Sequence, residues 1–278
     1  MCCEDLNAER SQRNTVLNMG FLADVKGFLE LIYEIGSPKF FWITFTRIIF
    51  PYFWRTLWHG KSIEYRALDF VKKTAKEGNP GSVLDALEEY HLNYEVMMAV
   101  MPEKRRKIEE VARKAAPKVC LEMGCFVGVS AMAVARHIPP GGRLITTEID
   151  TLTAKAAREL FSFAGLDQVI TVVNERAEDV IKVLRSEYSV DKLDLVVLDH
   201  RKWSYLPDLK ALEKGGFLHK GTVIIADDCF WPCVPGYLEY VENDPRYQTE
   251  RFYSVSFPGV FDIPDAIAIS TYKGGDNN

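Results

Sequence analysis

The sequence predicts an α/β protein with a Rossmann-like fold, built on a seven-stranded, mostly parallel sheet with an antiparallel edge. From residue 61 onward, short apolar runs alternate with amphipathic segments, a pattern typical of βαβ units around a buried sheet. A glycine-containing turn follows the first run, and acidic residues follow three of the later ones. These positions share the carboxyl edge of a parallel sheet, where α/β proteins bind their ligands.

The elements follow from the period of the apolar residues. Helices are expected near 61–77, 82–93, 102–115, 129–137, 151–164, 177–187 and 208–213. Strands are expected at 119–123, 144–147, 170–173, 193–198 and 222–226, with the antiparallel edge formed by 248–256 and 263–272. Ser82 is the predicted N-cap of the second helix, because its hydroxyl can accept a hydrogen bond from a free backbone N–H group.

Composition excludes several classes of protein. A net charge of −5 and a pI of about 5.7 argue against a nucleic-acid binder, which usually carries a basic stripe. The six cysteines lack the paired spacing of a zinc site. The chain does not start with a basic segment followed by an uninterrupted apolar one, so no signal peptide is predicted. A cytoplasmic, reducing location is therefore expected.

The first sixty residues differ from the rest, so two regions are predicted, 1–60 and 61–278. An apolar stripe at helical spacing comprises Phe21, Val25, Phe28, Leu29 and Ile32, and an aromatic run fills residues 40–54. That run is shorter than the roughly 20 residues that span a bilayer, and it contains Arg47 and Pro51. Two interpretations remain: residues 20–58 attach peripherally to the cytosolic face of a membrane, or they form helices packed on the main domain or a second subunit.

A nucleoside site is predicted after the first two strands. Gly124 and Gly128 allow the chain to turn sharply and to approach a ligand closely. Their spacing is not the G-x-G-x-x-G of dinucleotide binders, so no pyrophosphate cradle is implied. Glu148, at the end of the second strand and followed by Ile149, is placed to accept hydrogen bonds from both ribose hydroxyls.

A metal site is predicted at the ends of the fourth and fifth strands. Asp199, Asp227 and Asp228 offer the oxygen ligands that a hard divalent cation prefers. Lys202 follows three residues after Asp199 and is the candidate general base, because a nearby cation disfavours its ammonium form. The alternative is that these aspartates only cap the helices that follow them.

Several stretches of the chain resemble the catechol O-methyltransferase family: LEMG at 121–124, GRLITTE at 142–148, FAGL at 163–166, LDH at 198–200 and YLPD at 205–208. The resemblance extends over residues 61 to 274. It implies a class I methyltransferase fold, S-adenosylmethionine as methyl donor and Mg²⁺. It places Glu148 on the ribose, Asp199 and Asp227 on the metal, and Lys202 as the base. The cofactor-binding residues expected in all are Met98, Val100, Glu122, Gly124, Phe126, Gly128, Ser130, Glu148, Ile149, Glu178, Asp199 and His200.

The chain also departs from this family. Asp228 stands where the family has asparagine, so three carboxylates would hold Mg²⁺, Mn²⁺ or Ca²⁺ with stronger attraction. Val96 and Arg201 replace two tryptophans that flank the family's substrate. The family's substrate-binding glutamate falls near Gly259, with Asp262 the nearest acid. The expected substrate contacts are Arg201, Lys202, Trp203, Trp231 and Pro232.

Three functions compete. The first is methylation of a metal-bound hydroxyl on a catechol-like or related small molecule. The second is a membrane-associated binding or scaffold protein that keeps the fold without turnover. The third is methylation of a protein side chain. The retained Asp199, Asp227 and Lys202 favour the first, and the sequence leaves the oligomeric state open.

Overall fold

The structure is a computed structural model of the 278-residue chain. It describes residues 61–100, 102–256 and 263–274, and within the first sixty residues only Thr46, Phe50, Trp54 and Arg55; for Trp231 and Pro232 it describes the backbone alone. Residues 61–278 form one compact unit, which is described by itself here. The stripe predicted at residues 21–32 and most of the aromatic run lie outside the described residues.

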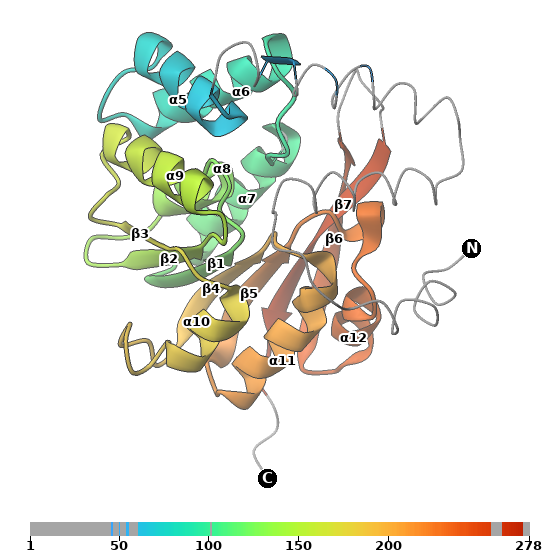
Figure 1. The fold of residues 1–278 in the computed structure, drawn as a ribbon. Coiled ribbons are helices and arrows are strands. Elements are labelled where there is room, and N and C mark those ends of the chain that lie inside the picture. The colour runs from blue at the N-terminus through green and yellow to red at the C-terminus, as the bar shows by residue number, and fades with distance from the viewer. Residues whose placement is uncertain are drawn as a thin grey trace, which may run out of the picture. The chain divides into compact units, whose positions relative to one another are not determined.

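The sheet of this unit has seven strands in the order β3-β2-β1-β4-β5-β7-β6 (Figure 1). The strands are β1 (Val119–Met123), β2 (Arg143–Thr147), β3 (Ile170–Val173), β4 (Leu193–Leu198), β5 (Leu218–Ala226), β6 (Tyr247–Ser256) and β7 (Ile263–Tyr272). Strands β1 to β5 pair in parallel, while β7 pairs antiparallel with both β5 and β6. The predicted Rossmann-like fold is confirmed. The strand order reverses at β1, so a ligand crevice is expected above β1 and β4.

Helices cover both faces of the sheet (Figure 1). One face carries α7 (Pro102–Ala115), α8 (Val129–Ala135) and α9 (Thr151–Phe163), with α5 (Ile63–Thr74) and α6 (Pro80–Asn93) beside them. The other face carries α10 (Ala177–Val183), α11 (Tyr205–Lys214) and α12 (Tyr237–Asn243). Because both faces are covered, β1 and β4 are buried almost throughout, which is why they appear in the sequence as continuous apolar runs.

Some local predictions were wrong. Helix α6 begins at Pro80 with Asn79 as its N-cap, not at Ser82. The Asn79 side chain accepts from the Ser82 N–H at 3.1 Å, and a proline in the first turn has no N–H to leave unpaired. Strand β5 begins four residues before the expected start at Thr222. Helix α12 and two short helices, η2 (Lys202–Ser204) and η3 (Cys229–Cys233), were not predicted.

No helix in the described part of the chain combines the length and the apolar character needed to cross a bilayer.

The turn from β1 to α8 depends on two glycines with positive φ, +96° at Gly124 and +75° at Gly128. A Cβ atom on Gly124 would lie 2.1 Å from the Asp199 carbonyl oxygen, and one on Gly128 would lie 2.3 Å from the Phe161 ring. The predicted sharp turn is therefore present. At both positions the space a side chain would need is filled by the protein itself.

Gly128→Ala should lower the free energy of unfolding by about 2–5 kcal/mol, because left-handed strain and overpacking against Phe161 add together. Gly141→Ala is the matched control: φ is +82° there, but nothing lies within 4 Å of the added Cβ. It should cost only about 1–2 kcal/mol. Urea denaturation followed by circular dichroism measures both, and equal losses would contradict the packing argument.

Candidate active site

A hollow opens at the carboxyl edge of β1, beside the glycine turn. It is lined by Met98, Ala99, Val100, Cys125, Phe126, Val127, Gly128, Val129, Ser130 and Asp199. The predicted cofactor residues Met98, Val100, Phe126, Gly128, Ser130 and Asp199 thus come together from three separate segments of the chain. Most of the lining side chains are apolar, and the Ser130 hydroxyl and the Asp199 carboxylate are the polar ones.

Glu148 lies at the end of β2, with its carboxylate fixed by the backbone. One oxygen accepts from the Phe126 N–H and the other from the Asp150 N–H, both at 2.9 Å. Burial raises the pKa of this carboxyl above its ordinary value, although the two backbone donors act in the opposite direction. Ile149, the next residue, is exposed. Glu148 is thereby tied to the glycine turn that forms the hollow.

Glu122 is a fully buried carboxyl group in β1. Its Oε2 accepts from the Thr146 hydroxyl at 2.5 Å, while its Oε1 has no partner within the described part of the chain. Burial raises the pKa of Glu122 to about 7, and repulsion from Glu148 adds to the shift. An orphaned buried oxygen suits a polar group of a ligand, because an unpaired buried acceptor is costly.

The two residues expected at an adenine ring differ in their surroundings. The His200 Nε2 atom lies 2.7 Å from Asp208 Oδ2, and its ring stacks on Tyr205 with 5.2 Å between centroids. Its Nδ1 is buried and has no partner among the described residues. Glu178 is exposed in the first turn of α10, 3.7 Å from Arg176. His200 is thus held in place, whereas Glu178 faces solvent.

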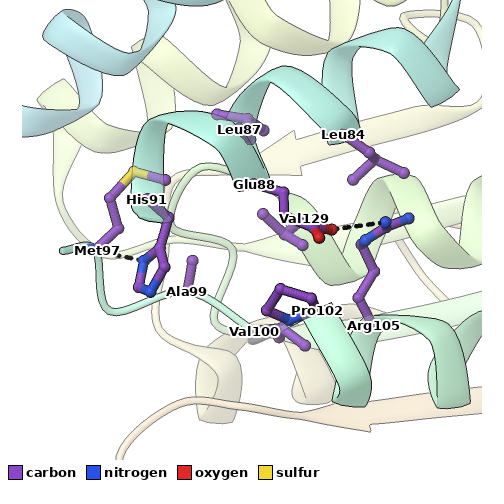
Figure 2. A pocket seen from close by; sticks show the side chains of 10 residues that line it. All are labelled: Leu84, Leu87, Glu88, His91, Met97, Ala99, Val100, Pro102, Arg105 and Val129. Carbon is purple, nitrogen blue, oxygen red and sulfur yellow. Dashed lines mark hydrogen bonds and ion pairs between the residues drawn. The ribbon is translucent and has the colours of Figure 1, made fainter. Parts of the chain in front are cut away.

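The segment from Met97 to Val100 is anchored by His91 of α6 (Figure 2). His91 Nδ1 accepts a hydrogen bond from the Met97 N–H at 3.0 Å, so Nδ1 carries no proton. Nearby, Arg66 makes a buried bidentate pair with Glu95, at 2.9 and 2.5 Å. These contacts hold one wall of the hollow at two points.

The three predicted metal ligands meet at the ends of β4 and β5. Asp199, Asp227 and Asp228 each offer one carboxylate oxygen, and these oxygens lie within 4.8 Å of one another. A dication with oxygen ligands at roughly 2.0–2.6 Å fits such a cluster. Neither η2 nor η3, the helices that follow these aspartates, has a side-chain cap. The capping alternative therefore has no support at these two helices.

Lys202 contacts this cluster from η2. Its Nζ lies 3.2 Å from both Asp199 Oδ1 and Asp228 Oδ2, and it donates to the Tyr205 hydroxyl at 2.8 Å. The Tyr205 hydroxyl in turn donates to the Asp227 carbonyl oxygen at 3.1 Å. Burial lowers the pKa of Lys202, but Tyr205 and the carboxylates outweigh it and hold that pKa well above the ordinary value. Without a metal ion, Lys202 is an ammonium group.

A second lysine, Lys104 on α7, also lies in this cluster. Its Nζ is 2.7 Å from Asp227 Oδ1 and 2.6 Å from both Asp228 Oδ1 and Asp265 Oδ2. Burial raises the pKa of Asp199 well above its ordinary value, whereas Lys202 and Lys104 overcome the same effect at Asp228 and lower its pKa. The sequence did not single out Lys104, Tyr205 or Asp265 as site residues. Lys104 stands in the basic run Lys104–Lys107, which is typical of a solvated helix face.

Two of the residues expected to contact the substrate lie on either side of Lys202. Arg201 and Trp203 are exposed beside Lys202. Trp231 and Pro232 fall in η3. Gly259 and Asp262 also lie outside the described residues.

The fold and the site together define a class I methyltransferase: a seven-stranded Rossmann-like sheet, a glycine turn after β1 and an acid after β2. The model of the O-methyltransferase family matches residues 72–250. Catechol O-methyltransferase of Bos taurus is 39% identical over 220 residues, covering 79% of this chain and 80% of its own. Transmembrane O-methyltransferase of Homo sapiens is 36% identical over 216 residues, covering 77% of this chain and 74% of its own.

A solved structure shows the same fold. O-methyltransferase TomG of Streptomyces achromogenes, in complex with SAM, superposes with a TM-score of 0.60 at 20% identity, covering 77% of this chain and all of its own. The chain belongs to the S-adenosylmethionine-dependent O-methyltransferase family and is a catechol O-methyltransferase-like member.

The pKa of Glu122 predicts a dependence of stability on pH. This pKa rises from 4.5 to about 7 on folding, so the folded state favours the neutral carboxyl. The stability that the neutral carboxyl contributes is fully present below the pKa of the unfolded state and is lost as the pH rises through the folded-state pKa of about 7. Glu122→Gln mimics the neutral form. The free energy of unfolding of Glu122→Gln minus that of the wild type should therefore be larger at about pH 8 than at pH 4.5, by about 3 kcal/mol. Denaturation at the two pH values measures this, and an identical difference at both would contradict it.

Proposed function

We propose that this protein transfers a methyl group from S-adenosylmethionine to a hydroxyl of a small molecule held at a divalent cation, with Mg²⁺ the first choice and Mn²⁺ or Ca²⁺ as alternatives. The observation that carries the proposal is the cluster of Asp199, Asp227 and Asp228, whose carboxylate oxygens lie within 4.8 Å of one another beside Lys202. Oxygen ligands of this kind suit hard cations.

The described residues fit the cofactor. Glu148, held by two backbone N–H groups, presents its carboxylate where ribose hydroxyls would donate. The orphaned Glu122 Oε1 and the Ser130 hydroxyl offer polar contacts near the methionine end. Met98 and Val100 line the hollow, and we assign His200 and Ile149 to the adenosine. Glu178 is our proposal for a solvent-side contact to the adenine.

The residues also fit the metal and define the chemistry. A cation bound by the three aspartates would polarise the acceptor hydroxyl. Lys202 lies against two of these aspartates, and Tyr205 holds its amine in place. We assign Lys202 as the general base that takes the hydroxyl proton at Nζ. Much of the rate advantage would then come from aligning the acceptor oxygen with the donor methyl group.

The acceptor is a catechol-like or related small molecule. We assign Arg201, Trp203, Trp231 and Pro232 as its contacts. Arg201 is exposed where the family resemblance implies a tryptophan, and a guanidinium there suits a carboxylate or phosphate substituent. The non-catalytic interpretation is less favoured, because Lys202 and the aspartates lie within contact of one another.

Lys202→Ala should reduce turnover by about 10²- to 10⁴-fold, the usual range for loss of an acid–base group. Cofactor affinity, measured by calorimetry, should barely change, because the lysine serves the acceptor. Wild-type turnover should rise with pH to a plateau and should stop when a chelator removes the metal. The exposed Lys182→Ala is the control and should match wild type. Full activity in chelator, or in Lys202→Ala, would contradict the mechanism.

For the first sixty residues we propose a separate region in which residues 20–58 attach to a membrane surface, which would place the protein peripherally on a cytosolic face. Phe50 and Trp54 support this: they stack with 6.3 Å between ring centroids and are 52% and 55% exposed. Aromatic side chains of this kind are favoured at membrane interfaces. Two relatives of this chain are named transmembrane O-methyltransferase, which is a further reason to test membrane attachment.

The full-length protein should co-sediment with anionic vesicles. Replacing both Phe50 and Trp54 by serine should lower its partition coefficient about tenfold or more, because two aromatic side chains no longer enter the interface. Leu152→Ser is the matched control, since Leu152 is equally exposed but lies on α9, and it should leave binding unchanged. Failure of the wild type to co-sediment would contradict attachment. Equal losses in both variants would instead indicate a non-specific effect of apolar surface.

A further inference from the structure

Lys104 is among the most deeply buried charged groups of the described chain, with 1% of its surface exposed. Its Nζ contacts three carboxylates, of Asp227, Asp228 and Asp265, at 2.6–2.7 Å. Two of these belong to the proposed metal cluster and the third does not. Lys104 therefore connects the cluster to a carboxylate behind it.

Asp265 holds Lys104 from the side of β7. Its Oδ1 accepts from the Phe230 N–H at 3.1 Å, and its Oδ2 accepts from the Ser256 hydroxyl at 2.7 Å. With 1% of its surface exposed, it is as buried as Lys104. Asp265 thus contributes charge to the site while its own hydrogen bonds hold its carboxylate in place.

The six charged groups of this site have a simple balance. With every group counted in its charged form, the carboxylates of Asp199, Asp227, Asp228 and Asp265 are opposed by the ammonium groups of Lys104 and Lys202, which leaves a formal charge of −2. A divalent cation would bring that charge to zero. Buried charges are tolerated when they are paired, so this balance bears directly on which ions the site accepts.

We propose that Lys104 is a positioning residue that acts as a fixed counter-charge, setting the formal charge of the metal site at −2 and so matching it to divalent rather than trivalent cations. This rests on the proposed metal-dependent function. Both oxygens of Asp228 face lysines, Oδ1 toward Lys104 and Oδ2 toward Lys202. The third carboxylate therefore adds less net negative charge than the sequence implies.

The electrostatic energy of a bound ion scales with its own charge, so a change in site charge acts more strongly on a trivalent than on a divalent ion. The ratio of Mn²⁺ to Tb³⁺ dissociation constants therefore reports the charge of the site. Both ions accept oxygen ligands, which limits differences in ligand preference. A change that only disturbed the geometry of the aspartates would weaken both ions without this dependence on charge.

Four full-length proteins test the proposal: wild type, Lys104→Met, Asp265→Asn and the double variant, with formal site charges of −2, −3, −1 and −2. Calorimetry with Mn²⁺ and Tb³⁺ alone, at one neutral pH and low salt, gives the ratio. It should rise about tenfold or more in Lys104→Met, fall by a similar factor in Asp265→Asn, and return near the wild-type value in the double variant.

The outcomes are distinguishable. A ratio that stays the same in all variants that bind metal overturns the role of Lys104 and leaves the metal site standing. A wild type that binds neither ion overturns the metal site, and this inference with it. If Lys104→Met does not fold, the other two variants decide, because the double variant removes both partners of the buried pair. It must then reverse the effect of Asp265→Asn, and failure to do so overturns the proposal.

Discussion

The pairing of two lysines with four aspartates, three of these six groups fully buried, is the constraint on which the rest of this site depends. A buried ammonium or carboxylate is tolerated only with partners in hydrogen-bonding geometry, because its desolvation is costly. Lys104 meets this requirement from α7, and Lys202 meets it from η2. Their partners come from the ends of β4 and β5 and from β7. Five elements must therefore be in register before these charges can be buried.

The sheet supplies this register. The Asp199 N–H donates to the Met123 carbonyl at 2.9 Å, and the Asp227 N–H donates to the Leu198 carbonyl at 2.9 Å. These bonds continue the β1–β4–β5 ladders past the strand ends, so the backbone of both aspartates is fixed to the edge of the sheet. Gly124 belongs to the same arrangement, since only a residue without Cβ lets the turn after β1 pass the Asp199 carbonyl. The hollow beside the glycine turn and the cluster of three aspartates therefore share one backbone constraint.

What the sequence could predict follows from how local each signal is. Six of the seven strands begin within one residue of the expected start, and those buried on both faces, such as β1 and β4, stand out as apolar runs. Strand β5 was the exception, since His219, Lys220 and Gly221 interrupt its apolar pattern. Glu148 and the three aspartates could be proposed as site residues because they directly follow strands. Lys104 lies 124 positions from Asp228 and 161 from Asp265, so no local pattern links these residues.

The difference between local signals and contacts far apart in the chain also explains why the charge of Asp228 could not be judged from the sequence. From the sequence, a third carboxylate means stronger attraction for a dication, because only the neighbouring acids are visible. In the structure, Asp228 has a left-handed backbone, with φ of +51°, and each of its oxygens faces a different lysine. A carboxylate paired in this way contributes ligand oxygens while much of its charge is already opposed. The affinity of the proposed metal site would therefore depend on the whole charge cluster and not on the number of acids that follow the strands.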